Sequence, residues 1–160
     1  MSAFVDHCHR IIPLLNELPR SRVARNHLIE SLVISLVEEV GHKRVALICH
    51  DKQNFAYALK LFGKTEVSIW LPKSFAQVKT YYSHCNSIIS VRGHGLIFAA
   101  ACKKPCSIVA LNLKMDTLFN FHYKSLSLGL DFNAQNHLLF LKENILPKQI
   151  ETPSKGELFS

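Results

Sequence analysis

The chain has 160 residues and a formal net charge of +7. A chain of this length forms one domain by the usual size range, and it can bury a core without the support of a metal or a disulfide. A hydrophobic content of 48% with only 19% charged residues excludes an intrinsically disordered chain. The positive charge favours anionic partners, but the basic residues are scattered rather than gathered with aromatics, so nucleic acid is not a favoured partner.

The cellular setting follows from what the sequence lacks. Its first residues do not show the basic-then-apolar pattern of a signal peptide, and apolar stretches such as residues 96–102 are too short to cross a bilayer. Five irregularly spaced cysteines indicate reduced thiols, and three of them, Cys49, Cys102 and Cys106, lie in apolar runs typical of buried positions. We therefore expect a cytoplasmic protein.

Two groups of residues suggest a metal site without supporting one. His7, Cys8 and His9 are adjacent, so their side chains point in different directions, and no second ligand pair has suitable spacing. Cys102 and Cys106 likewise do not have the ligand spacing that is typical of a metal site. We predict no metal and no cofactor.

The first forty residues predict two helices. Residues 4–18 have a short amphipathic pattern, and Ser21 can cap a stronger helix that runs to about Val40 and ends at Gly41. We expect residues 1–40 to pack on the rest of the domain. Because both helices lack obvious partners in a sheet, we also expect them to expose apolar surface that an oligomer or a partner could cover.

From residue 41 onwards, short apolar runs alternate with helical patterns. The predicted strands cover residues 45–49, 67–71, 87–91 and 106–111, and the helices between them cover residues 54–62, 74–83 and 95–102. Continuous apolar strands that alternate with helices are typical of a parallel sheet covered on both faces. We therefore predict an α/β fold with a doubly wound, Rossmann-like sheet over residues 41–146, followed by a loose tail over residues 147–160.

Open parallel sheets bind ligands at the carboxyl ends of their strands. Arg92 follows the third predicted strand, and Gly93 and Gly95 allow a ligand to approach the backbone at the start of the next helix. Arg92 offers a planar fork for carboxylate or phosphate, and His94 can exchange a proton near neutral pH. Lys114, after the next strand, adds a second cation. These residues predict an anion pocket. The other strand ends are residues 49–51, 71–73 and 111–114.

Structural roles for the same residues remain open. Arg92 could neutralise a nearby carboxylate, and His94 could cap the helix. Asp51, at the end of the first strand, has the residue type and position of a helix N-cap, and that role is the favoured one for it.

The order of these residues resembles the signature of the polysaccharide pyruvyl transferase family. Its members have Arg-x-His at a strand end, a helix of small residues, a proline before the next strand and a lysine after it. Residues 88–101, Pro105 and Lys114 have this order here, and a weaker similarity covers about residues 22–130. The resemblance implies the C-terminal lobe of a two-lobed, glycosyltransferase-B-like enzyme. Such an enzyme transfers a pyruvyl group from phosphoenolpyruvate to two hydroxyls of a glycan sugar, forming a ketal.

Carried over by position, the resemblance gives these residues roles. Arg92 would hold the carboxylate or phosphate of the donor, and His94 would bind the donor and act as a general acid or base, so both are candidate catalytic residues. Gly93, Gly95 and Lys114 would complete the substrate-binding set. No counterpart of the family's N-terminal lobe is apparent in the sequence, so an oligomer or a partner chain would have to supply it.

Two other functions stay open beside this one. The chain could be a non-catalytic anion-binding or interaction module derived from the same fold. It could also be a lobe of a nucleotide-sugar glycosyltransferase, which would require an acidic residue placed for a ribose.

Overall fold

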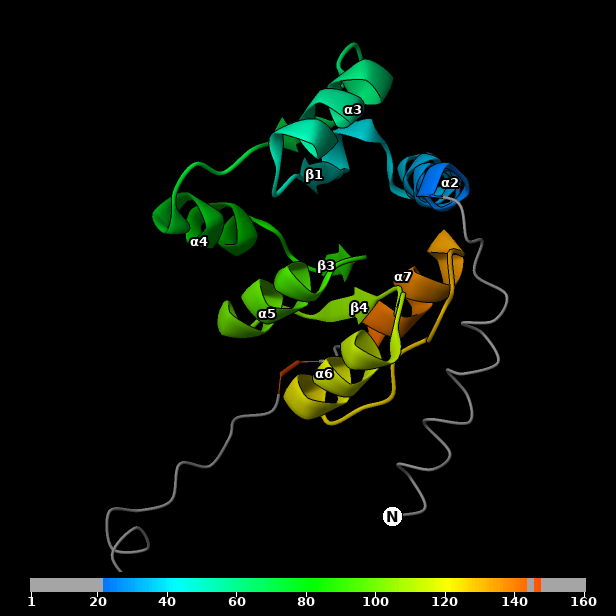
Figure 1. Cartoon of the computed structure of the whole chain (residues 1–160), viewed down its shortest axis with the longest axis vertical. Coiled ribbons are helices and arrows are strands. Elements are labelled where there is room, and N and C mark those ends of the chain that lie inside the picture. Colours follow the sequence, from blue (N-terminus) through cyan, green and yellow to red (C-terminus); the bar gives the residue numbers. More distant parts are fainter. Residues whose placement is uncertain (1–21, 144–145, 148–160) are drawn as a thin grey trace, which may run out of the picture.

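The computed structural model describes residues 22–143 and 146–147 of the chain. Helices and short strands alternate along it, as predicted for an α/β protein (Figure 1). In chain order the elements are α2 (Arg22–Val40), the 3₁₀ turn η1 (His42–Arg44), β1 (Ala46–Ile48), α3 (Lys52–Phe62), β2 (Ser68–Trp70), α4 (Phe75–His84), β3 (Ile88–Ser90), α5 (Gly93–Ala101), β4 (Cys106–Ile108), α6 (Leu113–Tyr123) and α7 (Ala134–Lys142).

The strands are parallel, but they form two small sheets. β1 pairs with β2, and β3 pairs with β4, with Ser90 opposite Ile108 in the second register. The prediction of parallel strands is confirmed, whereas the single doubly wound sheet is not formed by the backbone hydrogen bonds of the described residues. Each strand has three residues rather than the five or six expected, so each ladder contains few hydrogen bonds.

Polar side chains set where the helices begin. Asp51, Ser74, Asn112 and Asn133 each accept a hydrogen bond from the backbone amide three residues later, at the starts of α3, α4, α6 and α7. Such a bond satisfies an amide that has no partner within the helix. Gly41, with φ of 89°, follows α2 in a conformation that disfavours other residues. Helices α6 and α7 were not among the predicted elements.

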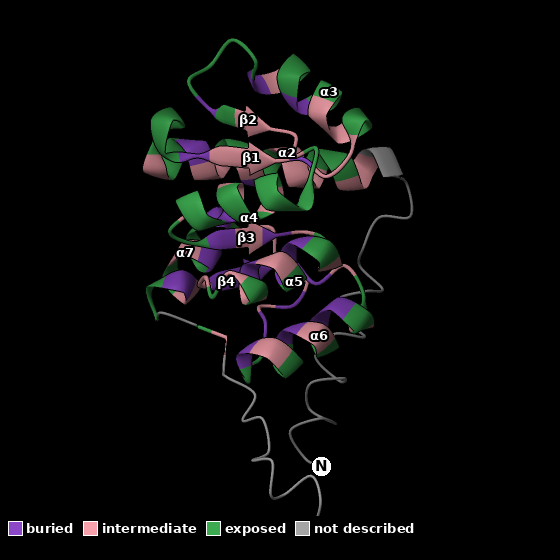
Figure 2. Ribbon diagram, turned by 90° about the vertical axis from the view of Figure 1, so that its left-hand side faces the viewer, coloured by how far each residue is buried: buried purple, intermediate pink, exposed green. Residues whose placement is uncertain are grey.

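The main core lies around β3 and β4. Leu96 of α5, Ile108 of β4 and Phe119 of α6 are completely buried there, and α4 contributes Tyr82. Figure 2 shows buried segments gathered at β3 and β4. This core fixes α5 and α6 side by side against the second sheet. The two helices therefore begin at the same edge, where β3 and β4 end.

Helix α2 packs against α7 and against residues of β1, β2 and α3, and most of its apolar side chains are at least partly covered. Leu32 packs with Val109 and Ala134, and Val37 packs with residues of β1, β2 and α3. The prediction that this helix lacks partners is therefore wrong for residues 24–40. The reason is tertiary: α7, absent from the prediction, lies against α2. The first predicted helix, over residues 4–18, and most of the predicted tail lie outside the described residues.

Two further observations concern the described part of the chain. None of its helices is both long and apolar enough to span a membrane. Its four cysteines are free thiols, of which Cys49 and Cys106 are buried as predicted and Cys102 is half-buried.

Candidate functional site

Each of the four parallel strands is followed by a helix, and three of these helix N-termini carry the candidate residues. Asp51 precedes α3, Arg92 precedes α5 and Asn112 precedes α6. The pairing of β3 with β4 brings the last two starts to one edge. This agrees with the rule that parallel sheets place functional groups at the carboxyl ends of their strands.

Arg92 lies in the turn between β3 and α5, as predicted. The strand ends at Ser90, one residue earlier than expected, and the helix begins at Gly93, slightly earlier than expected. The Ser90 hydroxyl fixes the turn because it donates to the Arg92 carbonyl at 2.7 Å and accepts from the Arg92 amide at 3.2 Å. Ser90 is itself buried, so the backbone of Arg92 is anchored to the interior of the protein.

The N-terminus of α5 differs from those of α3, α4, α6 and α7 because no side chain caps it. Its first amides and the helix dipole together favour an anion. Gly95 is buried, and a methyl group there would collide with the Ser90 hydroxyl. A methyl group at Gly93 would meet no atom within 4 Å. Gly95 thus permits close packing, while Gly93 borders open space.

The Arg92 guanidinium forms an ion pair with Asp51, with Nη1 3.2 Å from Oδ2. The alternative in which Arg92 neutralises a nearby carboxylate is thus observed in the structure, and so is the predicted capping role of Asp51. Both side chains are almost half exposed. Water screens such pairs, which typically contribute about 0.2–1 kcal/mol, so a stronger anionic ligand can displace Asp51.

The structure adds His50, which the sequence did not single out. Its Nε2 lies 2.9 Å from the hydroxyl of Tyr82, and its ring stacks on Phe98 with centroids 5.5 Å apart. Burial lowers the pKa of His50, and the nearby side chains of His94 and Arg92 lower it further, while Asp51 opposes them. His50 is therefore neutral at pH 7 and can accept a proton.

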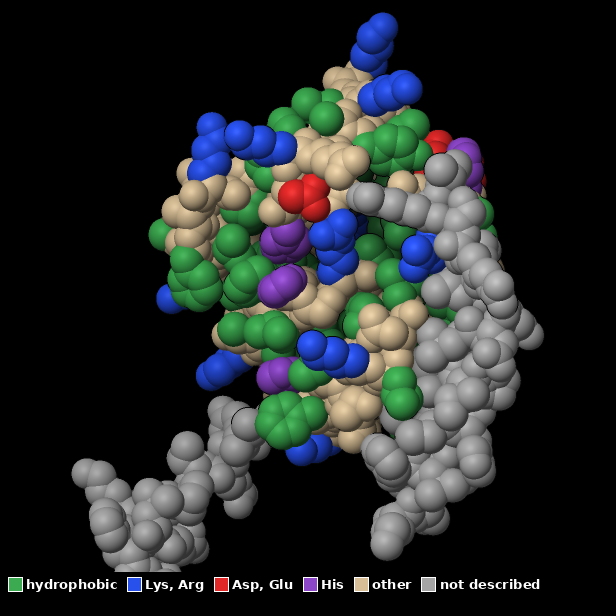
Figure 3. Space-filling view, viewed as in Figure 1, with side chains coloured by type: hydrophobic (Ala, Val, Ile, Leu, Met, Phe, Trp, Pro, Cys, Tyr) green, Lys and Arg blue, Asp and Glu red, His purple; other side chains and the backbone are tan. Residues whose placement is uncertain are grey.

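His94 is exposed in the first turn of α5 and lies close enough to His50 to influence its charge. Figure 3 shows histidine side chains beside an acidic and a basic side chain on the face towards the viewer. The structure thus brings His50 and Asp51 of one strand end together with Arg92 and His94 of another. The rule about strand ends selected both segments, but only the tertiary structure shows that they meet.

Lys114 lies in the first turn of α6. The strand before it ends at Ile108, and Asn112 caps the helix by accepting from the amide of Met115 at 2.9 Å. Lys114 is exposed, and it has the same place in α6 that His94 has in α5. It therefore lies at the same edge as Arg92, on the neighbouring helix.

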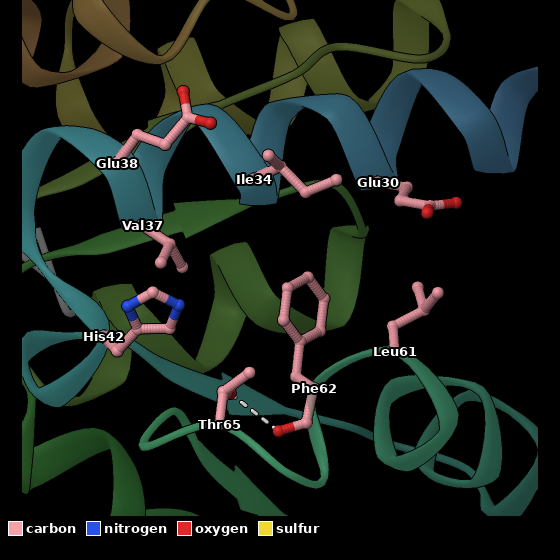
Figure 4. A pocket seen from close by; sticks show the side chains of 8 residues that line it. All are labelled: Glu30, Ile34, Val37, Glu38, His42, Leu61, Phe62 and Thr65. Carbon is pink, nitrogen blue, oxygen red and sulfur yellow. Dashed lines mark hydrogen bonds between the residues drawn. The ribbon is translucent and has the colours of Figure 1, made fainter.

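A separate hollow of about 270 Å³ lies between α2 and the end of α3 (Figure 4). Ile34, Val37 and Phe62 give it an apolar lining, and Glu30 and Glu38 add carboxylates. Two carboxylates disfavour an anionic ligand, so this hollow does not compete with the α5 edge as an anion site. No group of three or more metal-ligating side chains occurs within the part of the chain that the structure describes.

Comparison with known proteins gives one match. The model of the polysaccharide pyruvyl transferase family matches residues 13–112. These residues include Arg92, Gly93, His94 and Gly95, and they end two positions before Lys114. No curated protein and no solved structure matches the chain significantly. Because the family model covers more than half of its residues, this chain belongs to the polysaccharide pyruvyl transferase family.

Proposed function

We propose that this chain binds phosphoenolpyruvate at the N-terminus of α5 and transfers its pyruvyl group, as a ketal, to a sugar of a glycan. The observation that carries this proposal is the meeting of Arg92, His94 and His50 at a helix start without a side-chain cap, inside the residues matched by the family. Membership of the polysaccharide pyruvyl transferase family is shown by the match; the transferase activity, the donor and the reaction are our proposal.

Phosphoenolpyruvate carries a carboxylate and a phosphate, and the α5 edge offers a partner for each. The planar guanidinium of Arg92 can bind either group in a bidentate manner, once it has released the Asp51 carboxylate. The first amides of α5 supply further donors, and Gly93 leaves them accessible. Lys114, at the neighbouring helix start, supplies a second positive charge.

The two histidines suit the proton transfers of the reaction. We assign to His94 the donation of a proton to the methylene carbon of phosphoenolpyruvate, which becomes the methyl group. A sugar hydroxyl then attacks the adjacent carbon and loses its proton to neutral His50. The bond from that carbon to the phosphate oxygen breaks, phosphate leaves, and a second hydroxyl adds and loses its proton to close the ketal. Of the two protons lost by the sugar hydroxyls, one replaces the proton that His94 gave to the methyl group. The other ends on the released phosphate, so the reaction balances.

We further propose that the reaction takes place in the cytoplasm, where phosphoenolpyruvate is present, and that an oligomer or a partner chain completes the cleft.

A second function has one observation in its favour. Asp51 pairs with the arginine fork, as it would in a purely structural ion pair. A non-catalytic anion-binding module of the same fold is therefore the competing proposal.

Turnover separates the two proposals. Phosphate release from phosphoenolpyruvate is measured for the full chain with and without a panel of methyl hexosides, and NMR detects the ketal methyl group. The transferase proposal expects sugar-dependent phosphate release that His94→Gln abolishes while phosphoenolpyruvate still binds. The exposed His84→Gln, on α4, is the matched control and keeps activity. Binding without release for the unaltered chain would leave the module instead.

A further inference from the structure

An aromatic surface adjoins the proposed donor site. Phe98 lies four residues after His94 on α5, so the two side chains share one face of the helix. The ring of Phe98 stacks on His50, and Phe75, the first residue of α4, meets Phe98 edge-on with centroids 6.1 Å apart. The histidines and the two phenylalanines therefore form one continuous surface from the start of α5 to the start of α4.

This surface borders a hollow between α4 and α5, two helices that lie side by side (Figure 1). The hollow has a volume of about 220 Å³. This is below the roughly 300–1,000 Å³ that is usual for drug-sized ligands, so it suits a single ring. It is lined by Phe75, Val78, Lys79, Phe98, Ala101 and Cys102.

Phe75 lies mostly outside the core. Its side chain is 72% exposed, the largest value among the exposed large hydrophobic residues of the described part of the chain. It therefore contributes little to the core, whereas its ring is available to a ligand. Lys79, one turn further along α4, can donate hydrogen bonds to hydroxyl groups at the same hollow.

We propose that this α4–α5 surface binds the acceptor sugar, with the apolar face of a hexopyranose ring against Phe75 and Phe98. The inference rests on the proposed function for the reaction it serves. An acceptor hydroxyl must reach the reacting carbon of the donor, so the acceptor has to lie directly beside His50 and His94. Of the surfaces that adjoin these residues in the described structure, one side has the charged pair Asp51–Arg92, and the other has aromatic rings. The C–H groups of a sugar ring match the electron-rich face of an aromatic ring.

The test measures sugar binding and donor binding separately on the full chain. Saturation-transfer NMR with methyl glucoside, methyl galactoside and methyl mannoside gives the sugar affinity, and calorimetry gives that for phosphoenolpyruvate. We expect Phe75→Ala to weaken binding of the preferred hexoside about five- to tenfold, the effect of one lost aromatic contact. Donor affinity should not change. Phe75→Trp should keep sugar binding, and Phe75→Leu, which keeps apolar area but lacks a ring face, should lose most of it.

Phe121→Ala is the matched control, because Phe121 is also an exposed phenylalanine but lies near the far end of α6. The proposal is overturned if none of the three hexosides binds, or if Phe75→Ala binds sugar as Phe121→Ala does. It is also overturned if sedimentation shows that Phe75→Ala dissociates an oligomer, because the surface would then join copies of the chain. Failure of the donor proposal has a different signature: sugar binding would depend on Phe75 while phosphoenolpyruvate would not bind.

Discussion

Replacement of Gly95 by alanine tests how closely α5 packs on β3. Gly95 lies on the buried side of α5, where an added methyl group would collide with the Ser90 hydroxyl and come within 3.3 Å of the Tyr82 hydroxyl. Ser90 cannot move freely because its hydroxyl holds both the amide and the carbonyl of Arg92. The change should therefore disturb the turn that carries the arginine.

The magnitude follows from two opposing effects. Overpacking a buried position costs about 1–3 kcal/mol, and alanine stabilises a helix interior by roughly 0.5–1 kcal/mol relative to glycine. Because the colliding Ser90 hydroxyl is held in place, we take the upper part of the overpacking range, about 2–3 kcal/mol. The net loss for Gly95→Ala is then about 1–2.5 kcal/mol, which lowers the melting temperature by roughly 2–10 °C in a chain of this size. Gly93→Ala is the matched control on the same helix. Its methyl group meets no atom within 4 Å, so stability should stay the same or rise slightly.

Urea denaturation followed through the fluorescence of Trp70 measures both variants. Both variants should bind anions more weakly, but for different reasons. Gly95→Ala weakens anion binding because the turn moves. Gly93→Ala weakens it in a stable protein, because the methyl group blocks the approach to the amides. If Gly95→Ala is as stable as the unaltered chain, or if Gly93→Ala is the less stable of the two, the packing deduced for α5 is wrong.

Three further predictions use other parts of the structure. Asp51→Asn keeps a good helix cap but removes the charge that holds Arg92, so calorimetry should show phosphoenolpyruvate binding strengthened about two- to fivefold; weaker binding would mean that Asp51 positions the arginine. The buried ring of His137 contacts the Ser107 hydroxyl and the Asp131 carbonyl, and burial lowers its pKa. Because the unfolded chain binds the proton more readily, stability should be full above the ordinary histidine pKa and fall as the pH drops below about 6.5. Urea titrations at several pH values should show a smaller fall for His137→Gln than for the exposed His84→Gln. Burial also raises the pKa of Cys49 and raises that of Cys106 to about 12, so mass spectrometry after brief alkylation at pH 8 should find both unmodified; their rapid labelling would contradict this.

The sequence predicted most of the elements and part of the site. Apolar runs and helix caps are local signals, so the four strands and the predicted helices between residues 21 and 102 were found within a few residues. Asn112 and Asn133 are also caps, but the segments after them mix polar and apolar residues around the helix, and α6 and α7 were missed. The division into two sheets depends on which strand edges meet, and no local pattern specifies that.

The site shows the same limit. Arg92 and His94 stand out because they follow one strand at a glycine-rich helix start, whereas His50 follows another strand and looks ordinary in the sequence. Its role depends on its neighbours: the Tyr82 hydroxyl, the Phe98 ring and the charges of His94 and Arg92. These come from α4 and from the start of α5, more than thirty residues after His50 in the chain.

Calorimetry with phosphoenolpyruvate and with inorganic phosphate tests the central claim that Arg92 and the start of α5 form a donor site. We predict a clear preference for phosphoenolpyruvate, which salt weakens. Arg92→Lys keeps the charge but not the fork, and it should lose about 1.5–3 kcal/mol of binding free energy, at least tenfold in affinity. Arg44→Lys, at an exposed arginine before β1, is the control and should change nothing. Equal, weak binding of both ligands that Arg92→Lys leaves unchanged would contradict the account.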